Sequence, residues 1–110
     1  MKLPNGEASI VEIEKLRDYC LNPAHPRGRH KARVFKSRLG MTAAHSEELR
    51  RALIDAALKE NATLGDSDQY GTRYIMDFEL RHGEKTAQLR SCWIILSDEI
   101  APRFVTCYIL

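Results

Sequence analysis

The sequence lacks an apolar run long enough to cross a bilayer, and it lacks a signal peptide. No stretch approaches the roughly 18 consecutive apolar residues of a membrane-spanning helix, and the opening residues MKLPNGEAS contain no apolar core. We therefore expect a cytoplasmic protein that does not associate with membranes. The three cysteines are an odd number without an export signal, which favours free thiols over a disulfide framework.

Acidic residues are absent between His25 and Ser46, whereas residues 25–38 carry six Lys or Arg. The formal net charge of the whole chain is +2, so the residues outside this basic block together carry −4. A local basic block on an otherwise slightly acidic chain points to an anionic partner more than evenly spread charge would. The other interpretation is a solvated helix that binds nothing.

The 110 residues, 44% of them apolar, are enough for a single domain with one ordinary core over residues 1–110. Helical periodicity predicts helices at about residues 12–21, 29–39 and 44–59, with Gly40 closing the second. Period-two alternation predicts strands at about residues 70–80, 85–96 and 103–109, with a hairpin turn at His82-Gly83 and residues 8–13 as a candidate edge strand. The fold class is therefore α+β, with about three N-terminal helices packed on a C-terminal antiparallel sheet of three to four strands.

The helix predicted over residues 29–39 has a narrow core stripe formed by Ala32, Phe35 and Leu39. Lys31 lies one turn before Phe35, so we expect its stem to be partly shielded at the edge of this stripe. A shielded Lys whose ammonium reaches an open pocket is a candidate phosphate ligand or electrophile. The alternative is an ordinary Lys that covers apolar surface with its stem.

The loop HPRGR precedes this helix and has the features of an anion site. Free backbone N–H groups and Gly28 lie at the positive end of the helix dipole, and Arg27 and Arg29 add charge-assisted hydrogen bonds. His25 and His30 are candidate general bases or acids near neutral pH; the alternative for each is a histidine that bonds to backbone. No histidine or cysteine spacing matches a zinc signature, so we expect neither a metal ion nor another cofactor.

The predicted hairpin brings a second polar cluster onto one face of the sheet. It makes Asp77 and Arg90 diagonal neighbours and places Arg73 on the same face. The last strand adds either Thr106 and Tyr108 or Arg103 and Cys107, two alternatives that the sequence leaves open. Such a face can hold a scissile phosphate and stabilise developing charge, although cross-strand ion pairs on a solvent face are the alternative.

The segments HPRGRHKA, YGTRY, LRSCWII and PRFVTCYIL, taken together, resemble a family of small bacterial domains of unassigned function. Members of that family also occur at the C-termini of polymorphic toxins, and the stand-alone forms are encoded beside a second small protein. The order of helices and strands is similar to that of the barnase, EndoU and RelE group of ribonuclease toxins. The resemblance implies a toxin with a small antitoxin or immunity-like partner.

The leading hypothesis is therefore a toxin of a toxin–antitoxin or polymorphic toxin system that acts as a metal-independent endoribonuclease on RNA. The candidate catalytic residues are His25, His30, Lys31, Arg73 and Asp77. The candidate substrate-binding residues are Arg27, Arg29, Tyr70, Arg90 and Tyr108, the tyrosines by stacking on bases. The alternative is a non-enzymatic module that holds an acidic protein or nucleic acid on the basic helix. Tyr19, Phe35 and Trp93 are interpreted as packing residues.

Overall fold

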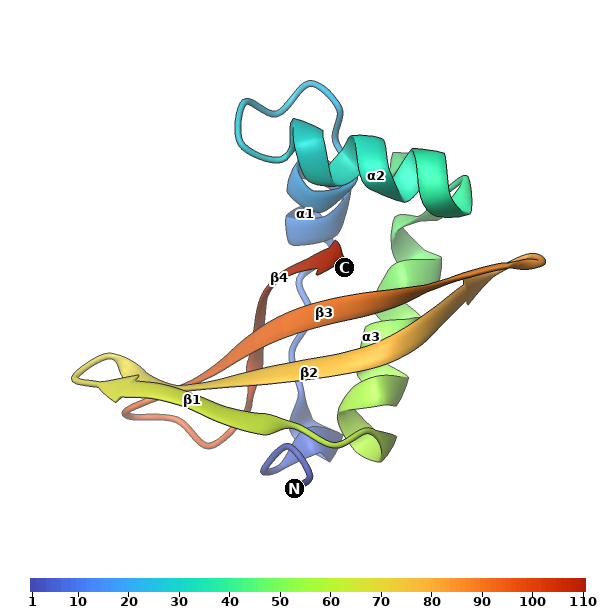
Figure 1. Cartoon of the computed structure of the whole chain (residues 1–110). Coiled ribbons are helices and arrows are strands. Elements are labelled where there is room, and N and C mark those ends of the chain that lie inside the picture. Colours follow the sequence, from blue (N-terminus) through green and yellow to red (C-terminus); the bar gives the residue numbers. More distant parts are fainter.

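The computed structural model describes residues 1–110 and places the helices before a four-stranded antiparallel sheet (Figure 1). The helical elements are η1 (Gly6–Ala8), α1 (Ile13–Lys15), η2 (Leu16–Cys20), α2 (Arg29–Leu39), η3 (Ala43–His45) and α3 (Ser46–Lys59). The strands, neighbours in this order across the sheet, are β1 (Thr63–Asp68), β2 (Gly71–His82), β3 (Lys85–Leu96) and β4 (Arg103–Ile109). The predicted α+β fold is confirmed. None of the helices combines the length and apolar character needed to span a membrane.

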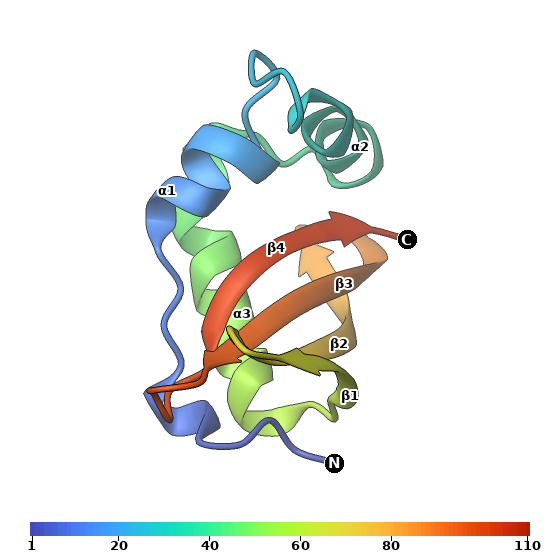
Figure 2. The same cartoon turned by 90° about the vertical axis from the view of Figure 1, so that its left-hand side faces the viewer.

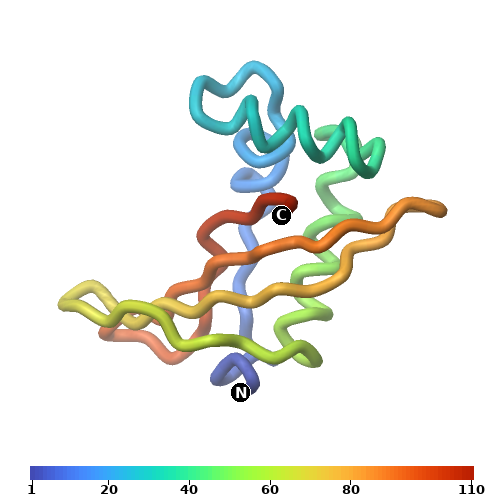
Figure 3. The backbone as a smooth tube through the Cα atoms, viewed as in Figure 1, coloured from blue at the N-terminus to red at the C-terminus, as the bar shows by residue number.

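The sheet is covered on one face by α3, while α2 crosses above the ends of β3 and β4 (Figures 1 and 2). The core between these layers contains the fully buried Trp93, Phe104, Leu53 and Phe35. Alternate residues of β2, among them Met76, point into this core, as the period-two pattern predicts. The chain trace shows β4 ending beneath α2, so the C-terminal strand and the basic helix lie side by side (Figures 2 and 3).

Helix α2 begins and ends where the sequence predicts. Ala32, Phe35 and Leu39 are its buried residues, which confirms the narrow core stripe. Gly40 ends the helix with φ at 71°, a left-handed conformation that glycine adopts without a steric cost. Lys31 is half-buried, as expected for a residue at the edge of the stripe.

The segment predicted as one helix over residues 12–21 is helical but irregular. The α-helical part, α1, has three residues, and the next five form a π-helical turn, η2. A π-helical turn holds one residue more than an α-helical turn, and such turns are common at functional sites. Leu16 and Cys20 are buried by η2, whereas Tyr19 is only half-buried and faces the region where α2 begins.

Two details of the predicted sheet are wrong. The β2–β3 turn consists of Gly83 and Glu84, one residue later than expected, which places Asp77 directly opposite Arg90 rather than diagonal to it. The candidate edge strand over residues 8–13 forms only a single parallel bridge. Strand β1 fills the edge instead, although most of its side chains are exposed and its sequence shows no apolar alternation.

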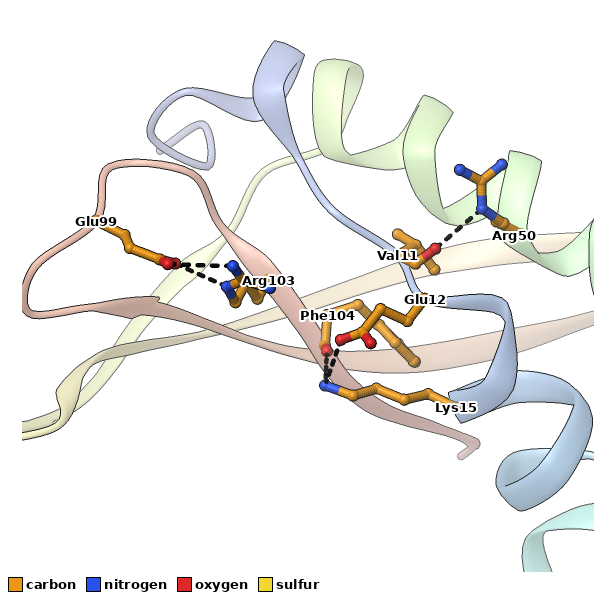
Figure 4. A network of polar contacts seen from close by, with 7 residues as sticks. All are labelled: Val11, Glu12, Lys15, Arg50, Glu99, Arg103 and Phe104. Atoms are coloured by element: carbon orange, nitrogen blue, oxygen red, sulfur yellow. Dashed lines mark hydrogen bonds and ion pairs between the residues drawn. The ribbon is translucent and has the colours of Figure 1, made fainter.

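Polar contacts nevertheless hold the N-terminal segment against β4 and α3 (Figure 4). The Lys15 ammonium donates to the carbonyl of Phe104 at 2.8 Å, and the Arg50 guanidinium donates to the carbonyl of Val11 at 2.9 Å. The Phe104 N–H also donates to the carbonyl of Ile10 at 2.9 Å. These bonds satisfy backbone groups of the segment without a full strand.

Candidate functional site

The side chain of Lys31 joins three elements that lie far apart in the sequence. Its ammonium donates to the Tyr19 hydroxyl of η2 at 2.8 Å and to the Thr106 hydroxyl of β4 at 3.2 Å. The Lys31 nitrogen also lies 4.6 Å from the ring centroid of Tyr19 and 6.0 Å from that of Tyr108. These ligands are neutral, and Lys31 takes part in none of the ion pairs of the molecule. A half-buried cation with neutral ligands favours binding of an anion.

The HPRGR loop positions Tyr19 for this contact. A Cβ atom at position 28 would overlap the carbonyl oxygen of Tyr19, so Gly28 allows the loop to press directly on η2. The Nδ1 atom of His25 accepts the backbone N–H groups of Arg27 and Gly28, each at 3.0 Å. The ring of His25 also meets the ring of Tyr19 edge-on, with 4.7 Å between centroids. The Nδ1 lone pair of His25 is therefore occupied in holding the loop.

The sheet supplies a second cation, Arg90, beside Tyr108. Thr106 pairs with Cys92 and Tyr108 pairs with Arg90, which decides between the two alternatives that the sequence left open for β4. Asp77 accepts two hydrogen bonds from the Arg90 guanidinium, at 2.9 and 2.8 Å. Asp77 and then Tyr108 raise the pKa of Arg90, and Arg90 in turn lowers the pKa of Asp77. The guanidinium is thus fixed beside the Tyr108 hydroxyl.

A buried thiol lies behind Thr106. The Sγ atom of Cys20 is 3.7 Å from the Thr106 hydroxyl oxygen. Hydrogen bonding from Cys107, helped by Thr106 and by the charge of Lys31, outweighs burial and lowers the pKa of Cys20 to about 6. Burial, together with the neighbouring Cys20, raises the pKa of Cys107. The positive charge of Lys31 is thus one of the causes that lower the pKa of the Cys20 thiol behind Thr106.

None of the six cations of residues 25–38 has a carboxylate partner. Most Lys and Arg elsewhere form ion pairs, but none of these six does: Arg27, Arg29, Lys31, Arg33, Lys36 and Arg38. Arg29, Arg33 and Lys36 line a groove of about 300 Å³ whose floor includes Leu21 and Met41. The surface of α2 is therefore an unneutralised positive stripe.

The other flank of α2 carries a separate shallow cavity of about 350 Å³. It lies between the helix and the end of β4, and its lining residues are His30, Lys31, Val34, Tyr108 and Ile109. His30 is exposed, and it stands at the rim of this cavity. Within the protein, no group of three or more His, Cys, Asp or Glu side chains is placed to hold a metal ion.

Two of the sequence-predicted site residues lie elsewhere. Arg73 donates to Asp68 at 2.9 Å, at the β1–β2 hairpin. Arg73 and Asp77 are four positions apart on β2, which is roughly 13 Å along a strand. Tyr70 is 64% exposed at the tip of the same hairpin, at the end of the sheet remote from α2 (Figure 1). The structure thus places Lys31, His30 and Tyr108 around one cavity. Arg90, paired with Asp77, lies next to Tyr108 on the sheet but lines a separate hollow, and Arg73 and Tyr70 lie farther away.

Comparison with known proteins places the chain in a family. Residues 2–110 match the model of a family described as a domain of unknown function, DUF6883. The chain is a member of the DUF6883 family. A search of curated proteins finds no match.

A search of solved structures shows that the fold of this DUF6883 domain is shared. It is similar to a chain of a contact-dependent growth inhibition toxin–immunity protein complex from Klebsiella pneumoniae 342, with a TM-score of 0.70. The two chains are 18% identical, and the match covers 92% of this chain and 99% of that one. At this identity the likeness is one of fold.

The sequence interpretation missed two ligands of Lys31 in this DUF6883 domain. Tyr19 was assigned to packing, yet its hydroxyl bonds to Lys31 and only part of its ring is buried. Thr106 was one of two open alternatives, because its orientation depends on a register shift where β4 passes Cys92 and Trp93.

Proposed function

We propose that this domain is a toxin that cleaves RNA, without a metal ion, at the site built around Lys31. The observation that carries the proposal is Lys31, a half-buried residue whose ammonium has neutral hydrogen-bond partners and whose side chain lines a cavity beside Tyr108. The fold supports it, because a domain of similar fold belongs to a toxin–immunity complex. Of those two roles, the unpaired cations of α2 favour the toxin, since RNA is a polyanion.

The proposed reaction is attack of a ribose 2′-hydroxyl oxygen on the adjacent phosphorus. The P–O bond to the 5′-oxygen of the next nucleotide breaks, leaving a 2′,3′-cyclic phosphate and a free 5′-hydroxyl. Lys31 would bind the non-bridging oxygens and stabilise the charge that develops on them. Arg90, held by Asp77, would supply a second cation.

Proton transfer falls to His30 in this scheme. An imidazole near neutral pH can take the proton of the 2′-hydroxyl or return one to the leaving oxygen. His30 stands at the rim of the cavity next to Lys31, whereas the Nδ1 atom of His25 is engaged by the loop. We therefore assign His25 to positioning Tyr19 and the HPRGR loop. Arg27 and Arg29 would bind phosphates at the start of α2, and Arg73 and Tyr70 would contact RNA only if it followed the sheet to the β1–β2 hairpin.

The test is incubation of the purified protein with RNA in the presence of EDTA, followed by analysis of the product ends. We expect cyclic phosphate ends with the wild type, strongly reduced cleavage with His30→Ala, and normal cleavage with Ser37→Ala as the matched control on α2. Absence of cleavage by the folded wild type, together with normal growth of cells that express it, would contradict the proposal.

The proposed toxin would be neutralised by a small acidic protein that covers α2. The groove lined by Arg29, Arg33 and Lys36 has no internal carboxylate, so acidic side chains of a partner would complete it. Co-expression with the protein of an adjacent gene should restore growth. Reversal of charge at Arg33 and Lys36 should weaken the complex, whereas reversal at Arg51, which already pairs with Glu47, should not.

A second candidate is a non-enzymatic module that holds nucleic acid or an acidic protein. The six unpaired cations favour it, because they provide an attractive surface without requiring any catalytic group. If the protein is such a module, each Arg replacement should cause a small and similar loss of affinity for nucleic acid or the acidic protein, and RNA should not be cleaved. Catalysis predicts instead that Lys31→Ala abolishes cleavage while RNA binding largely survives.

A further inference from the structure

An apolar patch interrupts the charged surface at the side of α2 that faces the C-terminal strand. Val34 is 37% exposed there, although its neighbours in sequence, Arg33 and the residues before it, are mainly cationic. The patch is the wall of the 350 Å³ cavity, in which Val34 and Ile109 stand beside the ring of Tyr108. Lys31 also lines this cavity, and its side-chain nitrogen lies 6.0 Å from the ring centroid of Tyr108.

We propose that this cavity is a nucleobase subsite, which holds the base of the nucleotide whose phosphate binds Lys31. The inference rests on the proposed function and adds to it a place and a chemistry for recognition of the base. A heterocycle has two flat apolar faces and a polar edge, and the cavity has matching parts: the apolar surfaces of Val34 and Ile109, the aromatic ring of Tyr108, and the imidazole of His30 at the rim.

The position of Lys31 specifies the occupant as a nucleotide rather than an apolar side chain. The ammonium is fixed by Tyr19 and Thr106, so an anionic group and a flat apolar group must bind side by side. A nucleoside monophosphate has this arrangement within one molecule. Stacking on an aromatic side chain typically strengthens binding by roughly 5- to 150-fold per base. A mononucleotide should therefore bind more tightly than its sugar phosphate.

The experiment is an NMR or calorimetric titration of the whole chain with three probes: inorganic phosphate, ribose 5-phosphate and nucleoside 3′-monophosphates. We expect the nucleotides to bind the wild type at least about tenfold more tightly than ribose 5-phosphate. Val34→Asn, which makes the wall polar without adding charge, should remove this gain and leave the affinity for phosphate nearly unchanged. Ser37→Asn, which introduces the same side chain one turn later on α2, is the matched control and should retain the gain.

Tyr108→Leu provides a second variant, since it keeps the cavity apolar and removes the ring. It should reduce the preference for nucleotides over ribose 5-phosphate, with an unchanged melting temperature. Equal affinity of the wild type for nucleotides and ribose 5-phosphate would overturn the subsite. That result, found together with RNA cleavage, would leave the proposed function standing. A clear preference for nucleotides without any RNA cleavage would instead overturn the catalytic function and retain the subsite.

Discussion

The Lys31 ammonium and the Tyr19 hydroxyl oxygen are 2.8 Å apart, although a whole loop separates the two residues in the chain. This contact fixes the ammonium of a lysine that has no carboxylate partner and whose side chain lines a surface cavity. Two structural devices maintain it, the packing of Gly28 on the Tyr19 carbonyl and the bonds of His25 to its own loop. The HPRGR loop therefore orients Lys31 indirectly, through Tyr19.

Tyr19→Phe isolates the contribution of the hydroxyl. The ring would keep its edge-on contact with His25, so the melting temperature should change little. The ammonium of Lys31 would lose one of its two hydrogen-bond acceptors, and the rate of RNA cleavage should fall by about tenfold, as expected for a bond worth ~1.5 kcal/mol. Single-turnover kinetics and a thermal melt measure the two effects. An unchanged cleavage rate would show that the phenol does not orient the lysine.

Gly28→Ala tests the packing of the loop. The added Cβ would overlap the carbonyl oxygen of Tyr19, so the backbone must shift. Forced overpacking costs about 1–3 kcal/mol of unfolding free energy. We expect the melting temperature to fall by roughly 5–20 °C, and cleavage to fall with it. Arg27→Ala removes an exposed neighbouring side chain without adding volume and should melt close to the wild type; equal melting temperatures for the two variants would refute the packing argument.

Because the pKa of the Cys20 thiol is lowered in the folded protein, we expect the stability of the protein to depend on pH. Its pKa in the folded protein is about 6, below the value of about 8.5 for an unfolded chain. The unfolded state therefore binds more protons between these values, and the free energy of unfolding should rise with pH across this window. The stabilisation is complete above about pH 8.5 and is lost as the pH falls through 6. Cys107, whose pKa is raised, acts in the opposite sense at still higher pH.

Denaturant unfolding at several pH values measures this slope. Cys20→Ala should flatten the curve between pH 6 and about 8.5. Cys92→Ala is the matched control, because burial raises rather than lowers the pKa of Cys92, and it should keep the slope. Parallel curves for the wild type and Cys20→Ala would show that the thiol of Cys20 stays protonated.

The unpaired cations of α2 predict a steep salt dependence of RNA binding. Each phosphate contact contributes about 0.7 to the slope of log affinity against log salt for single strands. Arg33→Ala should therefore lower the slope by roughly this amount. Arg51→Ala should leave it unchanged, since Arg51 is already paired with Glu47 at 3.4 Å. A slope that is insensitive to Arg33 would mean that RNA does not follow α2.

The bounds of α2, β3 and β4 could be predicted because local signals mark them. Gly40 ends the helix, and side chains alternate along β3 and β4 between the core and the outer face. Strand β1 could not be predicted, because it is polar and gains its regularity from pairing with β2. Local sequence propensity therefore determines α2, β3 and β4, whereas pairing with β2 determines β1.

The candidate site was only half predictable for a related reason. Lys31 was identified from its place beside the core stripe of its own helix, a local property. Its ligands Tyr19 and Thr106 come from a π-helical turn and from a strand with a register shift. Both irregularities change the direction of side chains, and neither has a sequence signature as clear as a helix cap.

Cleavage of RNA by the wild type and by Lys31→Ala, in EDTA, tests the central claim most directly. The account predicts 2′,3′-cyclic phosphate products with the wild type and a cleavage rate at least about 100-fold lower with Lys31→Ala, a loss typical of removing one group that stabilises developing charge. The variant should keep the melting temperature of the wild type, and Arg51→Ala, which removes a cation already paired with Glu47, should cleave nearly normally. Equal cleavage by the wild type and a folded Lys31→Ala would contradict the account.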